Sequence, residues 1–206
     1  MPKQLDLDTE RLPDNIQECR RCDLWIHASQ AVEGEGAADA RIMLVGEQPG
    51  DEEDFRGHPF VGPAGRILDQ CLDSAALRRD DVFLTNAVKH FKWEPRGKRR
   101  IHKKPSAREI AACRPWLDAE IEEIQPDIVV CLGATAAQSL LGRTFRVMQN
   151  RGKPVFPPGL PPIFATVHPS SILRAPDHDR REQARHSFVH DLRAAAAFLH
   201  QHRRAA

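Results

Sequence analysis

The chain of 206 residues lacks a long apolar run, a large excess of either charge, and an even number of cysteines. No segment is apolar over the roughly 20 residues that a membrane-spanning helix needs. The first residues, Met1 to Asp6, lack the charged-then-apolar pattern of a secretory signal. We therefore expect a cytoplasmic protein with no membrane partner. In that compartment, five cysteines argue against a disulfide framework.

The charges nearly cancel, since 30 Lys and Arg residues stand against 29 Asp and Glu residues. This balance argues against a protein coated in nucleic acid. The distribution is uneven, however: acidic residues gather at 51–54, and basic residues gather at 96–104 and 174–185. A local basic face can bind a phosphate backbone on a neutral molecule. The composition therefore permits DNA binding without requiring it.

Short, continuously apolar segments are typical of buried parallel strands, and they occur at residues 41–45, 82–85, 127–132 and 162–167. Helical patterns alternate with them at residues 65–77, 106–124, 134–141 and 180–200. Ser106 and Glu109 form a capping-box pattern at the start of one helix. The alternation predicts one domain over residues 1–206, a three-layer α/β/α sandwich around a central, mostly parallel four-stranded sheet.

Polar motifs follow the predicted strands. Gly46-Glu47-Gln48-Pro49-Gly50 follows the first, Asn86 ends the second, Gly133 ends the third, and His168-Pro169-Ser170 ends the fourth. Functional loops of such sheets lie at the carboxyl ends of the strands. We therefore expect these motifs to converge on one edge. A basic run, Gly97 to His102, follows the second strand and is by itself a generic nucleic-acid patch.

Together with three cysteines, at positions 19, 22 and 113, these motifs resemble the iron–sulfur branch of the uracil-DNA glycosylase superfamily. The string Lys98-Arg99-Arg100-Ile101-His102 is similar to a loop of its UdgX subfamily, whose members crosslink themselves to the DNA that they attack. The resemblance extends from Cys19 to the final helix. It implies a protein with a uracil-DNA glycosylase-like fold that acts on single- or double-stranded DNA containing uracil. Nothing in the sequence suggests an obligate dimer, so we expect a monomer.

The resemblance assigns base recognition to loop residues. Phe60, flanked by prolines and glycines, would be the stacking platform, although a lone phenylalanine is more often part of a core. Asn86 offers both a donor and an acceptor and would distinguish uracil from cytosine, or it would simply close a turn. Gln48 and Gly50 would line the pocket. Arg174 would lie near a phosphate beside an apolar wedge, or it would be only an exposed arginine.

The chemistry would fall to two histidines and a carboxylate. His168 would donate to the departing uracil oxygen. Glu47 would either activate water or polarise His102. The resemblance favours the second role, with the imidazole capturing the sugar C1′ after uracil leaves. Histidine beside lysines is otherwise more often a phosphate contact, and the basic residues Lys98, Arg99 and Arg100 would hold the loop on DNA in either case.

The cysteines suggest a [4Fe–4S] cluster, which usually takes four thiolates. Cys19, Cys22 and Cys113 supply three. His90 stands where the ordinary iron–sulfur glycosylases have a cysteine, and it is the expected fourth ligand. Cys71 and Cys131 are the rivals, but both have apolar neighbours and are assigned to the core. A structural zinc ion held by the same ligands is the alternative.

The sequence thus predicts a self-crosslinking uracil-DNA glycosylase. The nearest rival is a conventional, multiple-turnover iron–sulfur glycosylase in which water attacks C1′ and His102 only contacts phosphate. A rival of another class is a non-catalytic DNA-binding module in which the cluster is structural or redox-sensing. Such a module would leave uracil in the DNA.

Overall fold

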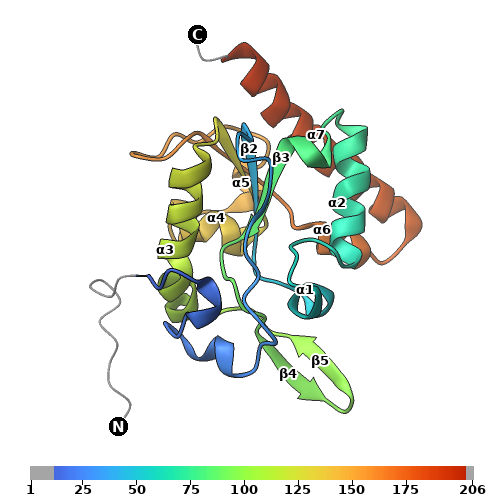
Figure 1. Ribbon diagram of the computed structural model, residues 1–206. Coiled ribbons are helices and arrows are strands. Elements are labelled where there is room, and N and C mark those ends of the chain that lie inside the picture. Colours follow the sequence, from blue (N-terminus) through green and yellow to red (C-terminus); the bar gives the residue numbers. More distant parts are fainter. Residues whose placement is uncertain (1–11, 203–206) are drawn as a thin grey trace.

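Five strands in the order β1-β3-β2-β6-β7 form the central sheet of the structure, a computed structural model that describes residues 12–202 (Figure 1). Four of them run parallel: β2 (Ile42–Gly46), β3 (Val82–Asn86), β6 (Ile128–Leu132) and β7 (Ile163–Thr166). These confirm the four predicted strands. The fifth, β1 (Glu35–Gly36), pairs antiparallel with β3 and is not among the predicted strands. A strand of two exposed residues has no periodicity to detect.

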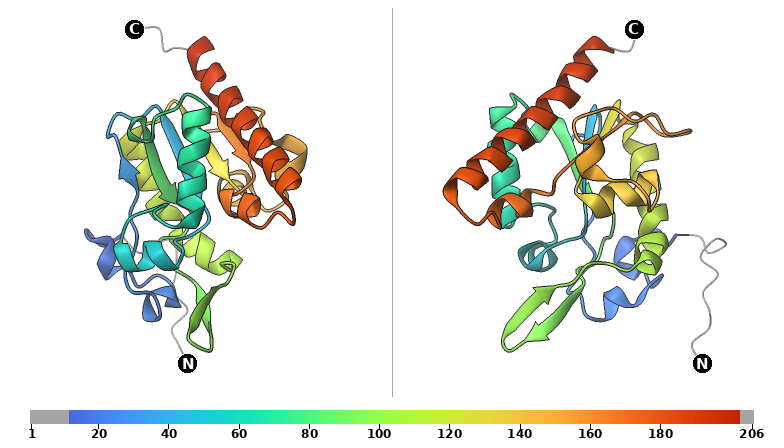
Figure 2. Two further views of the ribbon diagram at one scale, coloured as in Figure 1. Left: turned by 90° about the vertical axis from the view of Figure 1, so that its right-hand side faces the viewer. Right: turned by 180° about the vertical axis from the view of Figure 1, so that it is seen from behind.

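Alternating residues of each strand face opposite helical layers (Figure 2). Ile42 and Leu44 pack in one core cluster with helices α2 (Pro63–Ser74), α6 (Pro169–Leu173) and α7 (His178–Gln201). Met43 and Val45 pack in the other with α3 (Ala107–Ile124), α4 (Ala134–Leu141) and α5 (Val147–Asn150). The predicted three-layer sandwich is confirmed, with a mixed sheet of five strands instead of four.

Local signals account for the helix boundaries. Ser106 caps α3, with its Oγ accepting from the Glu109 N–H while the Glu109 carboxylate accepts from the Ser106 N–H, so the capping box is confirmed. The acidic run after Gly50 is a short helix, α1 (Asp51–Arg56). Cys71 and Cys131 are fully buried in the two cores, as predicted.

Between β3 and α3 the chain forms an antiparallel hairpin, β4 (Trp93–Arg96) and β5 (Arg99–His102), where the sequence predicts a loop. Arg96 pairs with Arg99, so the turn consists of Gly97 and Lys98, and Gly97 adopts the left-handed φ of +60° that such turns require. The hairpin extends beyond the sheet at the edge where α1 also lies (Figures 1 and 2). His102 is its last residue, at the base of the hairpin.

Before β1, the described residues form two 3₁₀ turns, η1 (Ile16–Glu18) and η2 (Asp23–Ile26). A third 3₁₀ turn, η3 (Arg79–Asp81), directly precedes β3. The first two turns lie beside the start of α3 (Figure 1). None of the helices within residues 12–202 combines the length and apolar character needed to cross a membrane. Met1 to Asp6, where the sequence lacks a secretory pattern, lie outside the described residues.

Candidate active site

Asn86 and the motif that begins at Gly46 meet at the carboxyl edge of the sheet, because Gly46 pairs with Asn86 in the β2–β3 register. A Cβ at Gly46 would stand 2.3 Å from Oδ1 of Asn86 and 2.7 Å from Cζ of Phe60. Only glycine therefore lets these two side chains approach. Asn86 is 3% exposed, and its amide makes no hydrogen bond to any residue in the described part of the chain. That amide remains available to a ligand.

The Phe60 ring also packs against Gly46. Its backbone has a left-handed φ of +55°, which is rare for an aromatic residue and points to a functional constraint. Arg79 holds this conformation by donating to the carbonyl oxygens of Pro59 at 3.0 Å and Phe60 at 3.5 Å. The Phe60 ring lies 6.3 Å from the imidazole of His168 in a stacked arrangement. Phe60 therefore lies against Gly46 and His168 as well as in the core.

His168 caps the amino end of α6 with its ring. Its Nδ1 accepts from the Ser170 N–H at 3.2 Å. A backbone N–H can only donate, so this contact places the imidazole proton on Nε2. Burial lowers the pKa of His168 to about 4, and the charges of Arg174 and His102 act in the same direction. His168 is therefore a neutral imidazole with a donor on Nε2 at neutral pH.

Glu47 lies between His102 and α4. Its Oε1 is 3.5 Å from Nε2 of His102, and its Oε2 accepts a hydrogen bond from the Thr135 hydroxyl. Burial lowers the pKa of His102, Glu47 opposes that shift, and Arg174 adds to it. The net direction keeps the imidazole neutral at pH 7, which leaves a nitrogen lone pair for nucleophilic attack. An imidazole and a carboxylate thus meet at the sheet edge.

Gln48 fixes the base of the hairpin from which His102 extends. Its Nε2 donates to the carbonyls of Lys92 and Lys103 at 3.1 and 3.2 Å, and its Oε1 accepts from the Lys92 N–H at 3.3 Å. The side chain thereby bridges the residues that flank the two hairpin strands. The sequence predicts that Gln48 lines the pocket; the structure gives it this additional contact with the hairpin backbone. Gly50, the cap of α1, accommodates the Glu53 carboxylate, whose Oε2 would lie 2.5 Å from an added Cβ.

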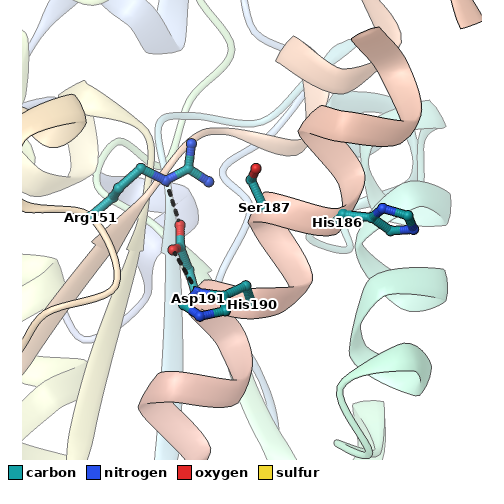
Figure 3. A pocket seen from close by; sticks show the side chains of 5 residues that line it. All are labelled: Arg151, His186, Ser187, His190 and Asp191. Atoms are coloured by element: carbon teal, nitrogen blue, oxygen red, sulfur yellow. Dashed lines mark hydrogen bonds and ion pairs between the residues drawn. The ribbon is translucent and has the colours of Figure 1, made fainter. Parts of the chain in front are cut away.

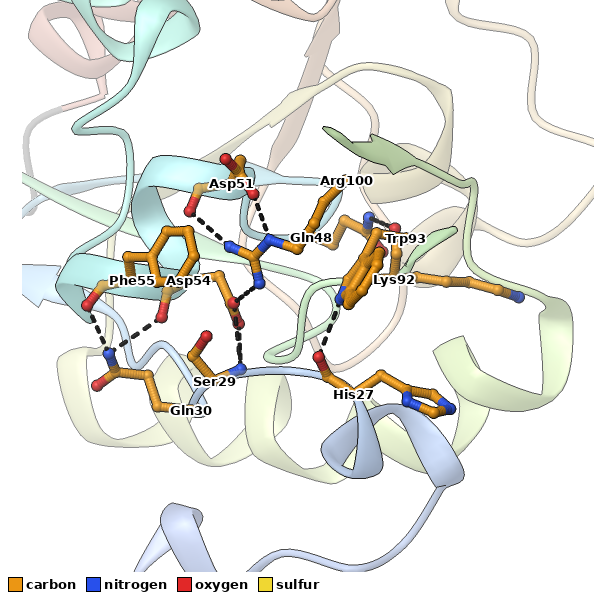
Figure 4. Close-up of polar contacts among 10 residues, drawn as sticks. All are labelled: His27, Ser29, Gln30, Gln48, Asp51, Asp54, Phe55, Lys92, Trp93 and Arg100. Atoms are coloured by element: carbon orange, nitrogen blue, oxygen red, sulfur yellow. Dashed lines mark hydrogen bonds and ion pairs between the residues drawn. The ribbon is translucent and has the colours of Figure 1, made fainter. Parts of the chain in front are cut away.

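Arg100 attaches the hairpin to α1 (Figure 4). Its guanidinium contacts Asp51 at 2.5 Å and Asp54 at 2.6 Å, and it lies over the Phe55 ring at 3.9 Å. Asp54 is fully buried and also accepts from the Ser29 N–H. The sequence groups Arg100 with Lys98 and Arg99 as a DNA contact, whereas here its charge is neutralised within the protein. Only 15% of its side chain is exposed.

The other basic residues that the sequence assigns to DNA contact have exposed side chains. Lys98 and Arg99 are exposed at the hairpin turn, and Arg174 is exposed just after α6. Arg174 lies near enough to His102 and His168 to lower the pKa of both. Leu173 beside it is an exposed large apolar residue. Exposed cations therefore come from two separate segments, the hairpin and the residue that follows α6.

Comparison with known proteins places the chain in a family. The profile described as "Uracil DNA glycosylase superfamily" matches residues 33–193, which contain all of the strand-end motifs. The chain belongs to the uracil-DNA glycosylase superfamily. A type-4 uracil-DNA glycosylase of Thermotoga maritima is 37% identical over 191 residues, covering 92% of this chain and 94% of the relative. The type-4 enzyme of Archaeoglobus fulgidus is 35% identical over 184 residues, covering 81% and 85%.

In this superfamily member, the three candidate thiol ligands gather at the start of α3. Cys19 accepts a hydrogen bond from Trp116 Nε1 at 3.3 Å, and Cys113 accepts from the Lys89 N–H at 3.2 Å. Burial raises the pKa of Cys113 to about 12, and the charges of Cys22 and Cys19 act in the same direction, so the three sulfurs lie close together. All five cysteines of the chain are free thiols.

His90, the expected fourth ligand, follows Lys89 in the chain. It is buried, and burial lowers its pKa to about 4, with the charge of Arg20 acting in the same direction. Within residues 12–202, no three His, Cys, Asp or Glu side chains are arranged around a point that would hold a single metal ion. In a cubane, four iron atoms each take one ligand, so the ligands stand farther apart than those around one ion. The sulfurs of Cys19 and Cys113, which accept hydrogen bonds from N–H groups, are compatible with a cluster of this kind.

A separate pocket lies between α7 and the turn after α5 (Figure 3). It has a volume of about 480 Å³, and none of the strand-end motifs lines it. Asp191 is buried beside it and accepts from Arg151 Nε at 2.7 Å and from the Thr166 hydroxyl at 2.6 Å. These contacts tie α7 to the end of β7 and the turn beside it, so their effect is structural.

Three of the groups that organise the site were not predicted from the sequence. Thr135 contacts Glu47, while Asp51 and Asp54 hold Arg100. A signal existed for Thr135, because it follows Gly133 at the end of a predicted strand. The two aspartates are indistinguishable in sequence from a solvated acidic face.

Proposed function

We propose that this chain excises uracil from DNA and then forms a covalent bond between His102 and C1′ of the resulting abasic sugar, in a single turnover. The observation that carries the proposal is the neutral imidazole of His102, held 3.5 Å from Glu47 at the edge where Asn86, Phe60 and His168 meet. The activity in the names of the type-4 relatives supports the excision step. The resemblance of the hairpin sequence to UdgX supports the capture step.

Recognition of the base uses the two side chains that meet beside Gly46, Asn86 and Phe60. The extruded uracil stacks on Phe60, a contact worth roughly 1–3 kcal/mol. The unpaired amide of Asn86 donates to O4 and accepts from N3–H, a pattern that uracil presents and cytosine does not. Gln48 and Gly50 border the pocket. The rigid backbone at Phe60 supports this role because a fixed ring is a pre-organised platform.

Departure of the base breaks the bond between C1′ and N1, and the bonding electrons leave with uracil as an anion. Nε2–H of His168 donates a hydrogen bond to the uracil oxygen on which negative charge gathers. A donor of this kind contributes on the order of 10²–10³-fold in rate. The low pKa of His168 supports hydrogen-bond donation by a neutral ring instead of full proton transfer.

Capture then forms one bond at the electron-poor C1′. A lone pair of the His102 imidazole makes the new nitrogen–carbon bond, and the ring becomes a cationic imidazolium. Glu47 balances that charge, and the excess proton of the imidazolium passes to solvent, while the uracil anion takes up a proton. Lys98, Arg99 and Arg174 contact phosphates, with Leu173 filling space in the duplex. The proposed enzyme acts as a monomer on single- or double-stranded DNA.

We further propose that Cys19, Cys22, Cys113 and His90 hold a [4Fe–4S] cluster. Such a cluster would crosslink the amino-terminal turns, the end of β3 and the start of α3, which is a structural contribution. The N–H groups of Trp116 and Lys89, which donate to ligand sulfurs, would influence its reduction potential.

The proposal is tested by incubating the protein with a uracil-containing oligonucleotide beside an identical thymine control, followed by a denaturing gel. A uracil-dependent protein–DNA band that survives heat and detergent is expected, and it should vanish in His102→Ser. Strand cleavage after alkali without such a band would instead indicate a conventional glycosylase. Neither product would indicate a binding module.

A further inference from the structure

Thr135 is a buried polar residue in the first turn of α4 that contacts the proposed catalytic carboxylate. It is 1% exposed, and its hydroxyl donates to Oε2 of Glu47. The residue before the helix, Gly133, has a left-handed φ of +98°, and a Cβ there would stand 3.1 Å from Cβ of His168. The start of α4 therefore packs against two functional side chains at once.

The hydroxyl restricts the orientation of Glu47. A glutamate side chain has three torsions, and the last is broad, so a carboxylate bound at neither oxygen rotates freely. Here Oε2 is held by Thr135, and this leaves Oε1 directed at Nε2 of His102 at 3.5 Å. Gln48, the next residue along the chain, is fixed to the hairpin that carries His102. Both partners of the Glu47–His102 pair are thus held in place from opposite sides.

We propose that Thr135 is a positioning residue for nucleophilic capture, the outer member of a chain Thr135–Glu47–His102. The inference rests on the proposed function. In the described part of the chain, the Thr135 hydroxyl hydrogen-bonds to Glu47 and to none of Asn86, Phe60 and His168. It therefore acts on capture of C1′ and leaves departure of uracil unaffected. Loss of the hydroxyl therefore slows one step selectively, whereas a merely structural defect would slow both steps together.

The test compares two time courses under single-turnover conditions, namely release of uracil and formation of the covalent adduct. In wild-type protein the two curves should nearly coincide. In Thr135→Val, which keeps the shape but lacks the donor, adduct formation should lag behind uracil release by roughly tenfold or more, the effect of losing a hydrogen bond to a charged group. Thr135→Ser retains a donor and should restore the wild-type ratio.

Ser139→Ala is the matched control, because this hydroxyl lies on the same helix and, among residues 12–202, hydrogen-bonds only to the Ala136 carbonyl. Thr135→Ala serves as a second donor-less variant if the valine protein does not fold. An unchanged ratio of the two rates in both donor-less variants, or an equal fall of both rates, would overturn the role of Thr135 while leaving the proposed function intact. Absence of any adduct in the wild type would instead overturn the proposed function itself.

Discussion

Oε1 of Glu47 lies 3.5 Å from Nε2 of His102, although the two residues come from separate parts of the fold. Glu47 follows the central strand β2, while His102 ends a hairpin outside the sheet. Their approach depends on contacts made by neighbouring residues, since Gln48 grips the base of the hairpin and Arg100 joins it to α1. The pair is therefore a property of the tertiary fold, and its disruption can be separated from loss of the fold.

Removing Arg100 should destabilise the protein, whereas removing its neighbour Arg99 should not. Arg100→Ala leaves the fully buried Asp54 without its cation, and breaking one side of a buried ion pair costs about 3 kcal/mol or more. Arg99 is exposed, so Arg99→Ala should change the free energy of unfolding by no more than about 0.5 kcal/mol. Urea unfolding of both variants measures this difference.

The same two variants separate anchoring from DNA binding. Arg99→Ala should reduce the slope of log affinity against log salt concentration by about 1, as expected for one lost phosphate contact. An equal loss of stability in the two variants would contradict the assignment of Arg100 as an anchor.

Protonation of His168 should contribute to acid destabilisation. Its folded pKa of about 4 lies below the ordinary value of 6.5, so the unfolded state binds a proton more readily than the folded state does. The associated stability is fully present above about pH 6.5 and is lost as the pH falls toward 4. In His168→Gln, the free energy of unfolding should fall less steeply over this range. Identical slopes in variant and wild type would count against a neutral His168.

Asn86→Asp should alter base selection. The substitution removes the NH₂ donor but keeps two acceptors, so the site no longer complements O4 of uracil. Because an unpaired buried polar group rejects a mismatched ligand strongly, excision of uracil should fall by about 10²-fold or more. Rates on matched uracil and cytosine oligonucleotides check the result. A uniform fall with an unchanged ratio would remove Asn86 from base recognition.

His90 should be required for iron binding. His90→Ala should lose the visible absorbance of the cluster, while His90→Cys supplies a thiolate and should retain it. Cys71→Ala and Cys131→Ala are controls, because both thiols are fully buried in apolar cores away from the proposed ligands. Iron analysis of the purified variants gives the number of iron atoms bound per chain. Full iron in His90→Ala, or loss of iron in a core-cysteine variant, would assign the fourth ligand elsewhere.

The sequence predicts features that depend on local pattern. The apolar runs locate the four parallel strands, and Ser106 with Glu109 marks the start of α3, because burial and capping leave a signature within a few residues. β1 cannot be predicted from the sequence because its two residues are stabilised by pairing with β3. The hairpin escapes for a similar reason, since Pro95 and a run of charges obscure its alternation.

Within the site, motif position predicts which loops converge, but it does not predict which charges neutralise each other. Arg99 and Arg100 are equivalent in sequence, yet only Arg100 faces Asp54. The contact between Thr135 and Glu47 joins two segments far apart along the chain. Such pairings arise when the helices pack on the sheet, so the sequence near either residue does not reveal its partner.

The most direct test of the account is the location of the bond to DNA. The heat-stable adduct should be isolated, digested with protease and nuclease, and sequenced by mass spectrometry. The account predicts the mass of an abasic deoxyribose on His102 and on no other residue. A modification on Lys103, Lys104 or any residue other than His102 would contradict it.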